Sequence, residues 1–327
     1  MSRFCAAIFG CDGLRLTADE RSLFRAVQPF GFILFARNID SAAQVRALCD
    51  ELRETVAHNA PILIDQEGGR VQRFRSPLAR EWLPPLEQVS KAGKNAARAM
   101  YLRYRIIAHE LMTLGVDANC APMVDVARED THPFLKNRCY GSDFAQVTDI
   151  GRAVANGLWD GGVFPVIKHM PGHGRAVVDS HLDLPRVSAA RSELESDFAP
   201  FRALNDLPMG MTAHIVFEDI DDAPATTSPT MMRLLREEIG FDGLIMTDDI
   251  GMEALDGTVD QRAVASLGAG CDVVLHCNGT FADRRAVAEA CGDMSEEAQR
   301  RAETVLLARR VPEAVDIDAL AEELNAF

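Results

Sequence analysis

The chain has 327 residues, of which 49 are acidic and 34 are basic, so its formal net charge is −15. This balance argues against a nucleic acid or an anionic membrane surface as the main partner. The longest apolar run is far shorter than the ~18 residues that a membrane-spanning helix needs.

The beginning of the chain and its cysteines predict a cytoplasmic protein. Residues 1–4 do not open the long apolar region that a secretory signal requires. The eight cysteines are scattered through the sequence and form no CxxC pair. In a chain of this length, that pattern is typical of reduced thiols in a cytosol.

Eight short apolar runs predict β-strands, in chain order at Ala6–Phe9, Phe32–Phe35, Ile62–Asp65, Val116–Ala121, Phe164–Lys168, Gly210–Thr212, Leu244–Thr247 and Asp272–Leu275. Longer stretches with apolar residues at helical spacing lie between them, notably Ala42–Ala57, Lys94–Leu114, Asp143–Asp160 and Gln261–Gly268. Strands that alternate with helices indicate a parallel sheet with helical crossovers. Eight such units without a Pro/Gly/Ser linker predict one α/β domain over residues 1–327, a (β/α)8 TIM-type barrel. A doubly wound open sheet is the alternative.

Polar side chains stand at the ends of four of these predicted strands. The residues are Asp65, Lys168 with His169, His214, and Asp248 with Asp249. All strands of a parallel barrel end at one face, and active sites are built there. One terminal Asp could be a helix cap, but Lys and His are not capping residues. The pattern therefore predicts an active site.

A cluster of histidines follows the fifth predicted strand. His169 and His173 lie in a Pro- and Gly-punctuated segment that we expect to be a loop from Lys168 to Gly174, and Asp179 and His181 follow closely. The density of titratable groups indicates a site, although any single one could be a structural histidine. A zinc site is an alternative, since the cluster offers enough nitrogen and oxygen ligands. The adjacent Lys168 would repel a cation.

The segment from Asp65 to Phe74 is the second candidate element. Gly68 and Gly69 allow a ligand to approach the backbone, and Arg70 and Arg73 bracket the turn. Carboxylates and guanidinium groups at a strand end suit the recognition of hydroxyl or acid groups.

Taken together, these motifs resemble glycoside hydrolase family 3, and within it the bacterial β-N-acetylglucosaminidases of the NagZ type. The resemblance covers most of the chain and rests on segments 32–38, 64–70, 168–174, 179–181, 211–214 and 247–252. It implies a single-domain barrel and a retaining β-N-acetylhexosaminidase that works through a covalent glycosyl-enzyme intermediate. Its expected substrates are 1,6-anhydro-N-acetylmuramoyl peptides in cytoplasmic peptidoglycan recycling, from which it would remove terminal β-linked N-acetylglucosamine.

The resemblance also assigns roles to residues. Asp248 would be the nucleophile and His181 the general acid/base, with Asp179 as its orienting partner; the residues alone do not separate Asp248 from Asp249. The N-acetylglucosamine unit would bind at Asp65, Arg73, Arg138, Lys168 and His169. A carboxylate can attack the anomeric carbon and leave again, and an imidazole can give and take a proton near neutrality. A His–Asp pair is a departure from the two carboxyl groups that most glycosidases use.

The resemblance implies no cofactor, no metal and no obligate protein partner. Three alternatives stay open at this point. One is a metal-dependent barrel hydrolase that uses His169, His173 and His181, and another is a family 3 β-glucosidase. The third is a sugar-binding barrel without activity, which the presence of Asp248, Asp179 and His181 disfavours.

Overall fold

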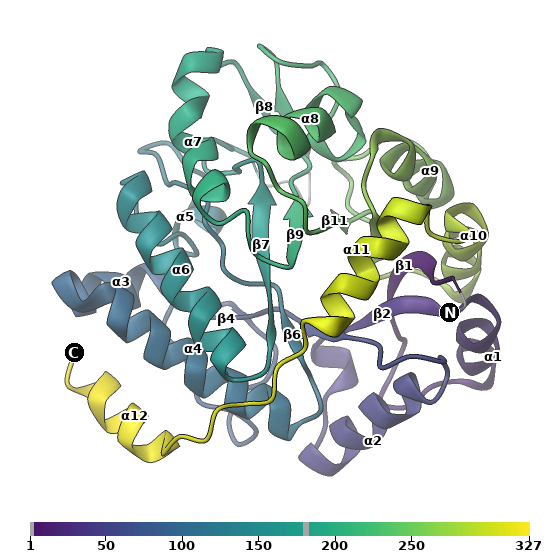
Figure 1. The fold of residues 1–327 in the computed structure, drawn as a ribbon, viewed down its shortest axis with the longest axis horizontal. Helices are drawn as coiled ribbons and strands as arrows, with labels where there is room; N and C mark the ends of the chain where they lie inside the picture. Colours follow the sequence, from purple (N-terminus) through teal and green to yellow (C-terminus); the bar gives the residue numbers. More distant parts are fainter. Residues whose placement is uncertain (1–2, 179–182) are drawn as a thin grey trace.

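The computed structural model describes residues 3–178 and 183–327. Eight parallel strands form a closed barrel in the order β1-β12-β11-β9-β7-β6-β3-β2 (Figure 1). Their bounds are β1 Cys5–Gly10, β2 Pro29–Leu34, β3 Ile62–Ile64, β6 Ala118–Asn119, β7 Phe164–Met170, β9 Met209–Thr212, β11 Leu244–Asp249 and β12 Val273–His276. Each predicted strand overlaps one of them, so the barrel is confirmed and the open sheet is wrong.

Two of the strands differ in length from the sequence prediction. Strand β7 continues to Met170, because Met170 pairs with Thr212 after a register shift. Lys168 is in the strand as predicted, and His169 and Met170 belong to the strand and not to the expected loop. Strand β6 is shorter than expected because side chains replace part of its backbone ladder: Asp117 accepts from the Ile62 N–H at 2.7 Å.

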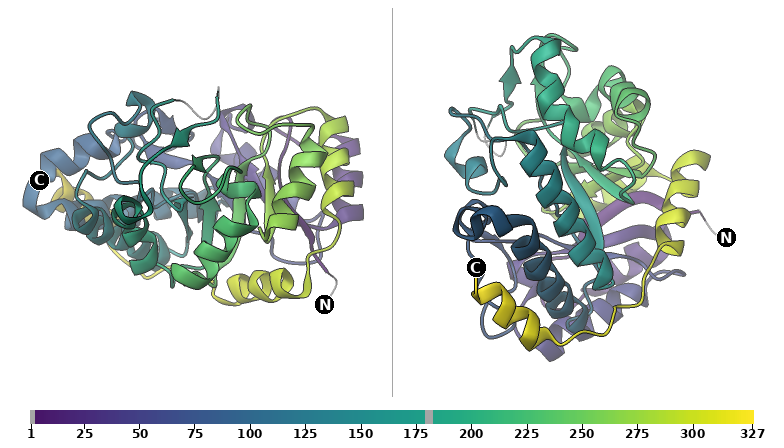
Figure 2. Two further views of the ribbon diagram at one scale, coloured as in Figure 1. Left: turned by 90° about the horizontal axis from the view of Figure 1, so that it is seen from above. Right: turned by 60° about the vertical axis from the view of Figure 1, so that its left-hand side comes forward.

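The helices lie around the outside of the barrel (Figure 2). Four of them, α2 Ala42–Arg53, α4 Ala96–Thr113, α6 Phe144–Asp160 and α9 Val259–Ala269, confirm the helical spacings read from the sequence within a few residues. The others are α1 Ala18–Val27, α3 Pro85–Ala92, α5 Pro133–Lys136, α7 Arg191–Ala203, α8 Pro229–Arg233, α10 Phe281–Cys291, α11 Glu296–Leu307 and α12 Ile317–Asn325. Helix α6 begins after Asp143, whose side chain accepts from the Gln146 N–H at 2.9 Å, as an N-cap does.

Two small sheets were not anticipated from the sequence. Strands β4 Gln66–Gly68 and β5 Val71–Gln72 pair antiparallel directly after β3, and β8 Arg186–Val187 pairs parallel with β10 Val216–Phe217. Each pair is only two or three residues long, which is too short for a period-two pattern to be visible. The first pair matters for function because β4 contains Glu67, which pairs with Lys168 at the end of β7 and with Arg138.

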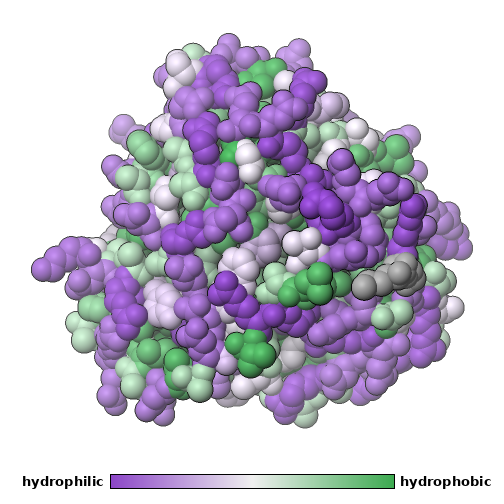
Figure 3. All heavy atoms as spheres, viewed as in Figure 1, coloured by the Kyte–Doolittle hydropathy of each residue, from purple (hydrophilic) through white to green (hydrophobic). Residues whose placement is uncertain are grey.

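The face of the molecule seen in Figure 3 is mostly polar. The carboxyl-terminal helix α12 is held against α4 by a two-bond contact in which the Arg98 guanidinium donates to Glu323, both bonds 2.8 Å long. In the part of the chain that the structure describes, no helix has the length and apolar character needed to cross a bilayer.

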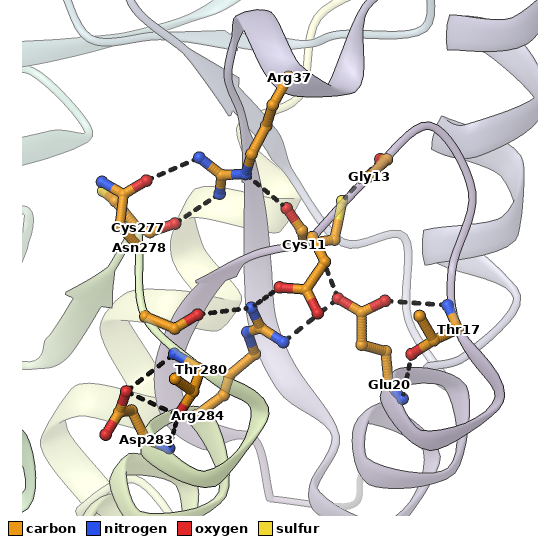
Figure 4. Close-up of polar contacts among 12 residues, drawn as sticks. Cys11, Gly13, Thr17, Glu20, Arg37, Cys277, Asn278, Thr280, Asp283 and Arg284 are labelled. Carbon is orange, nitrogen blue, oxygen red and sulfur yellow. Dashed lines mark hydrogen bonds and ion pairs between the residues drawn. The ribbon is translucent and has the colours of Figure 1, made fainter.

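The barrel closes between its first and last strands, and a buried ion cluster lies over that seam (Figure 4). Arg284 of α10 donates to Asp12 and, at 3.3 Å, to Glu20 of α1. Glu20 also accepts from the Thr17 N–H, and its own N–H donates to the Thr17 hydroxyl, which forms a capping box. Arg284 and Glu20 are both fully buried, so the seam is fixed by charged groups that have little access to water.

Candidate active site

A pocket of about 250 Å³ opens at the carboxyl-terminal face of the barrel, where the strand ends meet. Six of the predicted site residues line this pocket: Asp65, Arg73, Arg138, Lys168, His169 and Asp248. They come from different strands and loops that are up to 183 residues apart in the chain (248 − 65). The fold therefore brings together every predicted site residue that lies in the described part of the chain.

Alternating charges build one wall of the pocket. The Lys168 ammonium lies 2.9 Å from Asp65 and 2.7 Å from Glu67, and Arg73 donates to Asp65 at 3.1 Å. Arg138 holds Glu67 with two parallel bonds of 2.9 and 2.8 Å. Such paired bonds fix the orientation of the guanidinium plane.

These charges determine one another's protonation. Burial raises the pKa of Glu67, but Arg138 and Lys168 outweigh burial and bring the pKa down to about 2. For Asp65 the same balance of burial against Lys168 and Arg73 leaves the pKa well below its usual range. Burial lowers the pKa of Lys168, while Asp65 and Glu67 raise it to a net value above its ordinary one. All of these groups are therefore charged at neutral pH.

Donors toward the pocket remain after these pairings. Lys168 has three N–H bonds and two carboxylate partners, so one N–H is left for a ligand. The guanidinium of Arg138 uses Nε and Nη2 for Glu67, which leaves Nη1. This wall can thus donate hydrogen bonds to hydroxyl or carbonyl oxygens.

Asp125 orients the two histidines of the site. Its carboxylate accepts from Nδ1 of His169 at 2.7 Å and from the backbone N–H of His173 at 2.6 Å, and it is fully buried. Because a carboxylate only accepts, Nδ1 of His169 carries the proton and Nε2 remains for the pocket. Burial, with His169 as a further cause, lowers the pKa of His173 to about 3, so this ring is neutral.

The neighbouring carboxylates Asp248 and Asp249 have different surroundings at the end of β11. Asp249 accepts from the N–H groups of Gly251 and Cys277, both at 3.0 Å, and from the Asn278 amide at 3.3 Å. Asp248 accepts only from the Asp249 N–H, at 2.8 Å, among the described residues. Asp249 is therefore held as a structural acceptor, whereas Asp248 has oxygen lone pairs left for the pocket.

The charge of Asp248 is also stabilised. Burial raises the pKa of Asp248, but His169, His214 and the Asp249 N–H lower it by more, so the net pKa lies below its ordinary value. His214 donates from Nε2 to the Asp249 carbonyl at 3.0 Å, which ties it to the same strand end. Asp248 is thus an ionised, weakly hydrogen-bonded carboxylate at neutral pH.

The support of this strand end extends to β2. Arg37 donates to the Asn278 side chain at 2.7 Å and to the carbonyls of Cys11 and Cys277 at 2.9 and 2.6 Å (Figure 4). Asn278 in turn donates to Asp249. A single guanidinium therefore connects the ends of β1, β2 and β12, and it reaches Asp249 through Asn278.

The predicted pair Asp179 and His181 lies outside the described residues. The described chain reaches the pocket directly before that pair, at Val178, which is one of its lining residues. In the described ranges, no three His, Cys, Asp or Glu side chains are arranged to hold a metal ion. His169 and His173, which the alternative zinc site would use, both lie against Asp125.

Sequence reasoning assigned no role to Glu67, Asp125 or Arg37, and it identified His214 only as a strand-end residue of the predicted site. A signal for Glu67 was available, since two cations predicted in one buried site need more than one carboxylate partner. Glu67 also lies within the segment that was singled out. Asp125 carried no comparable signal, because its role depends on the pairing of the segment after β6 with β7, which places it beside His169, 44 residues later in the chain.

Comparisons with known proteins identify the family of the chain. The model of the glycosyl hydrolase family 3 N-terminal domain matches residues 10–307. The chain belongs to glycosyl hydrolase family 3. Within the family, a β-hexosaminidase from Alkalilimnicola ehrlichii is 40% identical over 281 residues, 83% of this chain and 80% of that protein.

Two solved family 3 structures are similar over nearly the whole chain. NagZ from Neisseria gonorrhoeae in complex with N-trifluoroacetyl-D-glucosamine has a TM-score of 0.84 at 29% identity, with 99% of this chain and 96% of that one covered. A β-N-acetylglucosaminidase from Paenibacillus sp. also has a TM-score of 0.84, at 30% identity, with 98% and 66% covered. The family resemblance read from the motifs is therefore confirmed.

Proposed function

We propose that this family 3 β-hexosaminidase removes terminal β-linked N-acetylglucosamine by a retaining, two-step hydrolysis. The observation that carries the proposal is the contrast at the end of β11, where Asp249 is occupied by three donors and Asp248 faces the pocket without a side-chain partner among the described residues. A retaining glycosidase needs such a carboxylate to attack the anomeric carbon and later to leave. Asp248 is the nucleophile in this proposal.

The sugar would bind against the charged wall. The remaining N–H of Lys168, Nη1 of Arg138 and Nε2 of His169 supply donors, while Asp65 and Arg73 frame the same side of the pocket. The hydroxyl groups and the acetamido carbonyl of N-acetylglucosamine are acceptors that match these donors. Because Glu67 and Asp125 fix Arg138, Lys168 and His169 in advance, substrate binding would not have to order them.

The acid/base role falls to His181, oriented by Asp179, on the strength of the family motif. In the first step His181 would protonate the leaving oxygen, and in the second it would take a proton from water. An aspartate beside the imidazole holds the required tautomer and stabilises the protonated ring. Val178, next to the pair in the chain, lines the pocket and supports this assignment.

We extend the proposal to cytoplasmic cell-wall recycling, with 1,6-anhydro-N-acetylmuramoyl peptides as substrates and residues 1–327 as one catalytic barrel domain. All eight cysteines are free, which is consistent with a reducing compartment. The similarity to a NagZ structure with a bound glucosamine derivative supports the amino sugar.

Hydrolysis of aryl β-glycosides that differ only in the sugar tests the substrate assignment. We expect kcat/KM for the N-acetyl-β-glucosaminide to exceed that for the β-glucoside by about 10²-fold or more, because a site built to hydrogen-bond a group discriminates against analogues that lack it. Equal rates would contradict the amino-sugar assignment. Loss of activity with a chelator would favour the metal-dependent alternative.

A fluoroglycosyl inactivator tests the nucleophile. Peptide mass analysis should find the label on Asp248, and Asp248→Ala should abolish turnover without a change in fold. A label on Asp249 would contradict the assignment. Asp249→Asn provides the matched control, since it removes the neighbouring charge and keeps the shape.

A further inference from the structure

A second pocket lies beside the candidate active site, outside the ends of β11 and β12. Its walls include Asp249, Glu253, His276, Asn278 and Asp283. Asp249 and Asn278 also line the active-site pocket, so the two pockets share a wall. The charged wall proposed for the sugar is at the ends of β3 and β7, and Asp248 stands between that wall and the second pocket in the strand order.

His276 is the unusual residue of this pocket. It ends β12 and is 1% exposed, and neither of its ring nitrogens has a hydrogen-bond partner in the described chain. A buried polar group without a partner is costly and requires an explanation. The ring packs edge-on against Phe9, with centroids 6.3 Å apart, so this contact uses no nitrogen.

A glycine lies beside the ring of His276, so no described side chain stands over this edge of the ring. Gly279 has a φ of +137°, and a Cβ built on it would lie 3.0 Å from Nε2 of His276 and 3.2 Å from Oδ2 of Asp283. Any side chain at position 279 would therefore cover the two acceptors at once. Glycine therefore leaves no side chain over the His276 nitrogen. The Asp283 oxygen beside it already accepts from the Thr280 N–H and hydroxyl, both at 2.8 Å, so Asp283 contributes negative charge to the pocket.

The charged side chains that line the second pocket are all negative. Three carboxylates line it, those of Asp249, Glu253 and Asp283, and no Lys or Arg does. The nearby Arg284 does not line the pocket: its guanidinium donates to Asp12 and Glu20 and, at 3.4 Å, to the backbone carbonyl of Gly279 (Figure 4). Burial lowers the pKa of His276, which keeps its ring neutral and able to accept a hydrogen bond. The pocket therefore offers the free acceptor nitrogen of His276, the exposed Glu253 carboxylate, and the negative charge of Asp249 and Asp283, which are already hydrogen-bonded.

An unpartnered acceptor nitrogen among three negative charges suits a group that carries N–H donors and a positive charge. A primary ammonium has three donors and no acceptor. A bound metal ion fits less well, because no described group of three or more His, Cys, Asp and Glu side chains has the arrangement to hold one.

We infer that the second pocket is a subsite for a primary ammonium group on the leaving portion of the glycoside. The inference rests on the proposed function for its substrate. A sugar bound against the charged wall has its anomeric carbon at Asp248, so the group that it releases starts beside the shared wall of Asp249 and Asn278. An aminoalkyl arm on that group can reach His276, Glu253 and Asp283.

Paired substrates test the inference. Each pair consists of an aryl N-acetyl-β-glucosaminide with a para-aminoalkyl arm and the same compound with the amine acetylated, over arms of two to six methylenes. The acetylated partner has the same leaving group without the charge. We expect kcat/KM to favour the amine about tenfold at the best arm length, as one charge-assisted hydrogen bond would give.

Variants assign that preference to the pocket. His276→Leu should bring the ratio of the two kcat/KM values close to one, and Glu253→Gln should lower that ratio about threefold. The control Glu237→Gln changes an exposed glutamate outside the pocket and should leave the ratio unchanged. The ratio is measured within each variant, so a general loss of activity cancels. A ratio near one in the unaltered enzyme at every arm length would overturn the inference.

A second measurement separates this inference from the proposed function. Pentylammonium chloride is titrated into protein labelled with ¹⁵N in histidine, with sodium chloride as the control, and the His276 ring signals are followed. A shift specific to the amine, together with a ratio above one, supports the subsite. A shift without hydrolysis of either substrate leaves the cation site in place and contradicts the glycosidase. The absence of a shift contradicts the subsite even if hydrolysis is rapid.

Discussion

Replacement of Glu67 by glutamine should destabilise the fold, because Glu67 is the shared partner of two buried cations. Arg138 and Lys168 both bond to it, and it is 1% exposed. Glutamine keeps the size of the side chain but leaves two buried positive charges without this counter-charge. Breaking a buried ion pair in this way typically costs ~3–5 kcal/mol.

The pKa of Glu67 gives a second measure of the same effect. The folded value of about 2 lies below the ordinary value of 4.5, and each unit corresponds to ~1.4 kcal/mol, so the shift is worth about 3 kcal/mol. For 327 residues the unfolding entropy is about 0.7 kcal/mol/K. We therefore expect the Tm of Glu67→Gln to fall by about 4 °C at pH 7.

The sign of the pH dependence follows from the depressed pKa. The contribution of Glu67 is fully present above pH 4.5 and is lost as the pH falls toward 2. The gap in stability between the two proteins should therefore shrink to roughly half by pH 3. Thermal unfolding followed by circular dichroism at pH 7 and pH 3 measures both effects.

The matched control is Glu237→Gln, which removes one negative charge from an exposed position. Its Tm should stay within about 1 °C of the unaltered protein, since exposed substitutions usually change stability by less than ~0.5 kcal/mol. Two results would refute the counter-charge argument. One is a Tm of Glu67→Gln equal to that of this control at pH 7, and the other is a difference in stability between Glu67→Gln and the unaltered protein that does not become smaller at pH 3.

Three further predictions concern catalysis. Asp125→Asn should lower kcat/KM by about 10- to 10²-fold with a small effect on Tm relative to Glu67→Gln, because His169 loses its anionic acceptor; unchanged kinetics would remove Asp125 from the positioning role. His181→Ala should impair natural disaccharide-type substrates about 10²-fold more than aryl glycosides with good leaving groups, and Asp179→Ala should do so in part; equal losses on both substrates would contradict the acid/base role. Because the lowered pKa keeps Asp248 ionised, protonation of this group should not reduce kcat/KM until the pH falls below about 4. A loss of kcat/KM near pH 6 whose midpoint shifts in Asp248→Glu would contradict this prediction.

The fold and the location of the site could be predicted because both depend on local patterns. Short apolar runs that end in Asp65, Lys168 and Asp248 are visible in the sequence, and a closed parallel barrel brings such ends to one face. The ends of the strands were less predictable. Met170 extends β7 through its pairing with Thr212, which is 42 residues away (212 − 170).

The partners within the site could not be predicted in the same way. Asp248 and Asp249 differ only in their hydrogen-bond donors, and two of the three donors to Asp249 come from the end of β12. His276 is similar, because a histidine at the end of an apolar run has the same sequence pattern whether its nitrogens are bonded or not. Such differences arise from contacts between elements that are distant in the chain.

The seam between β1 and β12 determines when this protein can finish folding during synthesis. Strand β1 has one neighbour, β2, from the start, but its other neighbour ends at residue 276, and Arg284 follows eight positions later (284 − 276). Until that segment leaves the ribosome, β1 has an open edge and Glu20 lacks its buried cation. A nascent chain that stalls before residue 273 therefore has an unpaired strand edge and a Glu20 carboxylate without its cation. Chaperones and proteases can act on such incompletely folded chains.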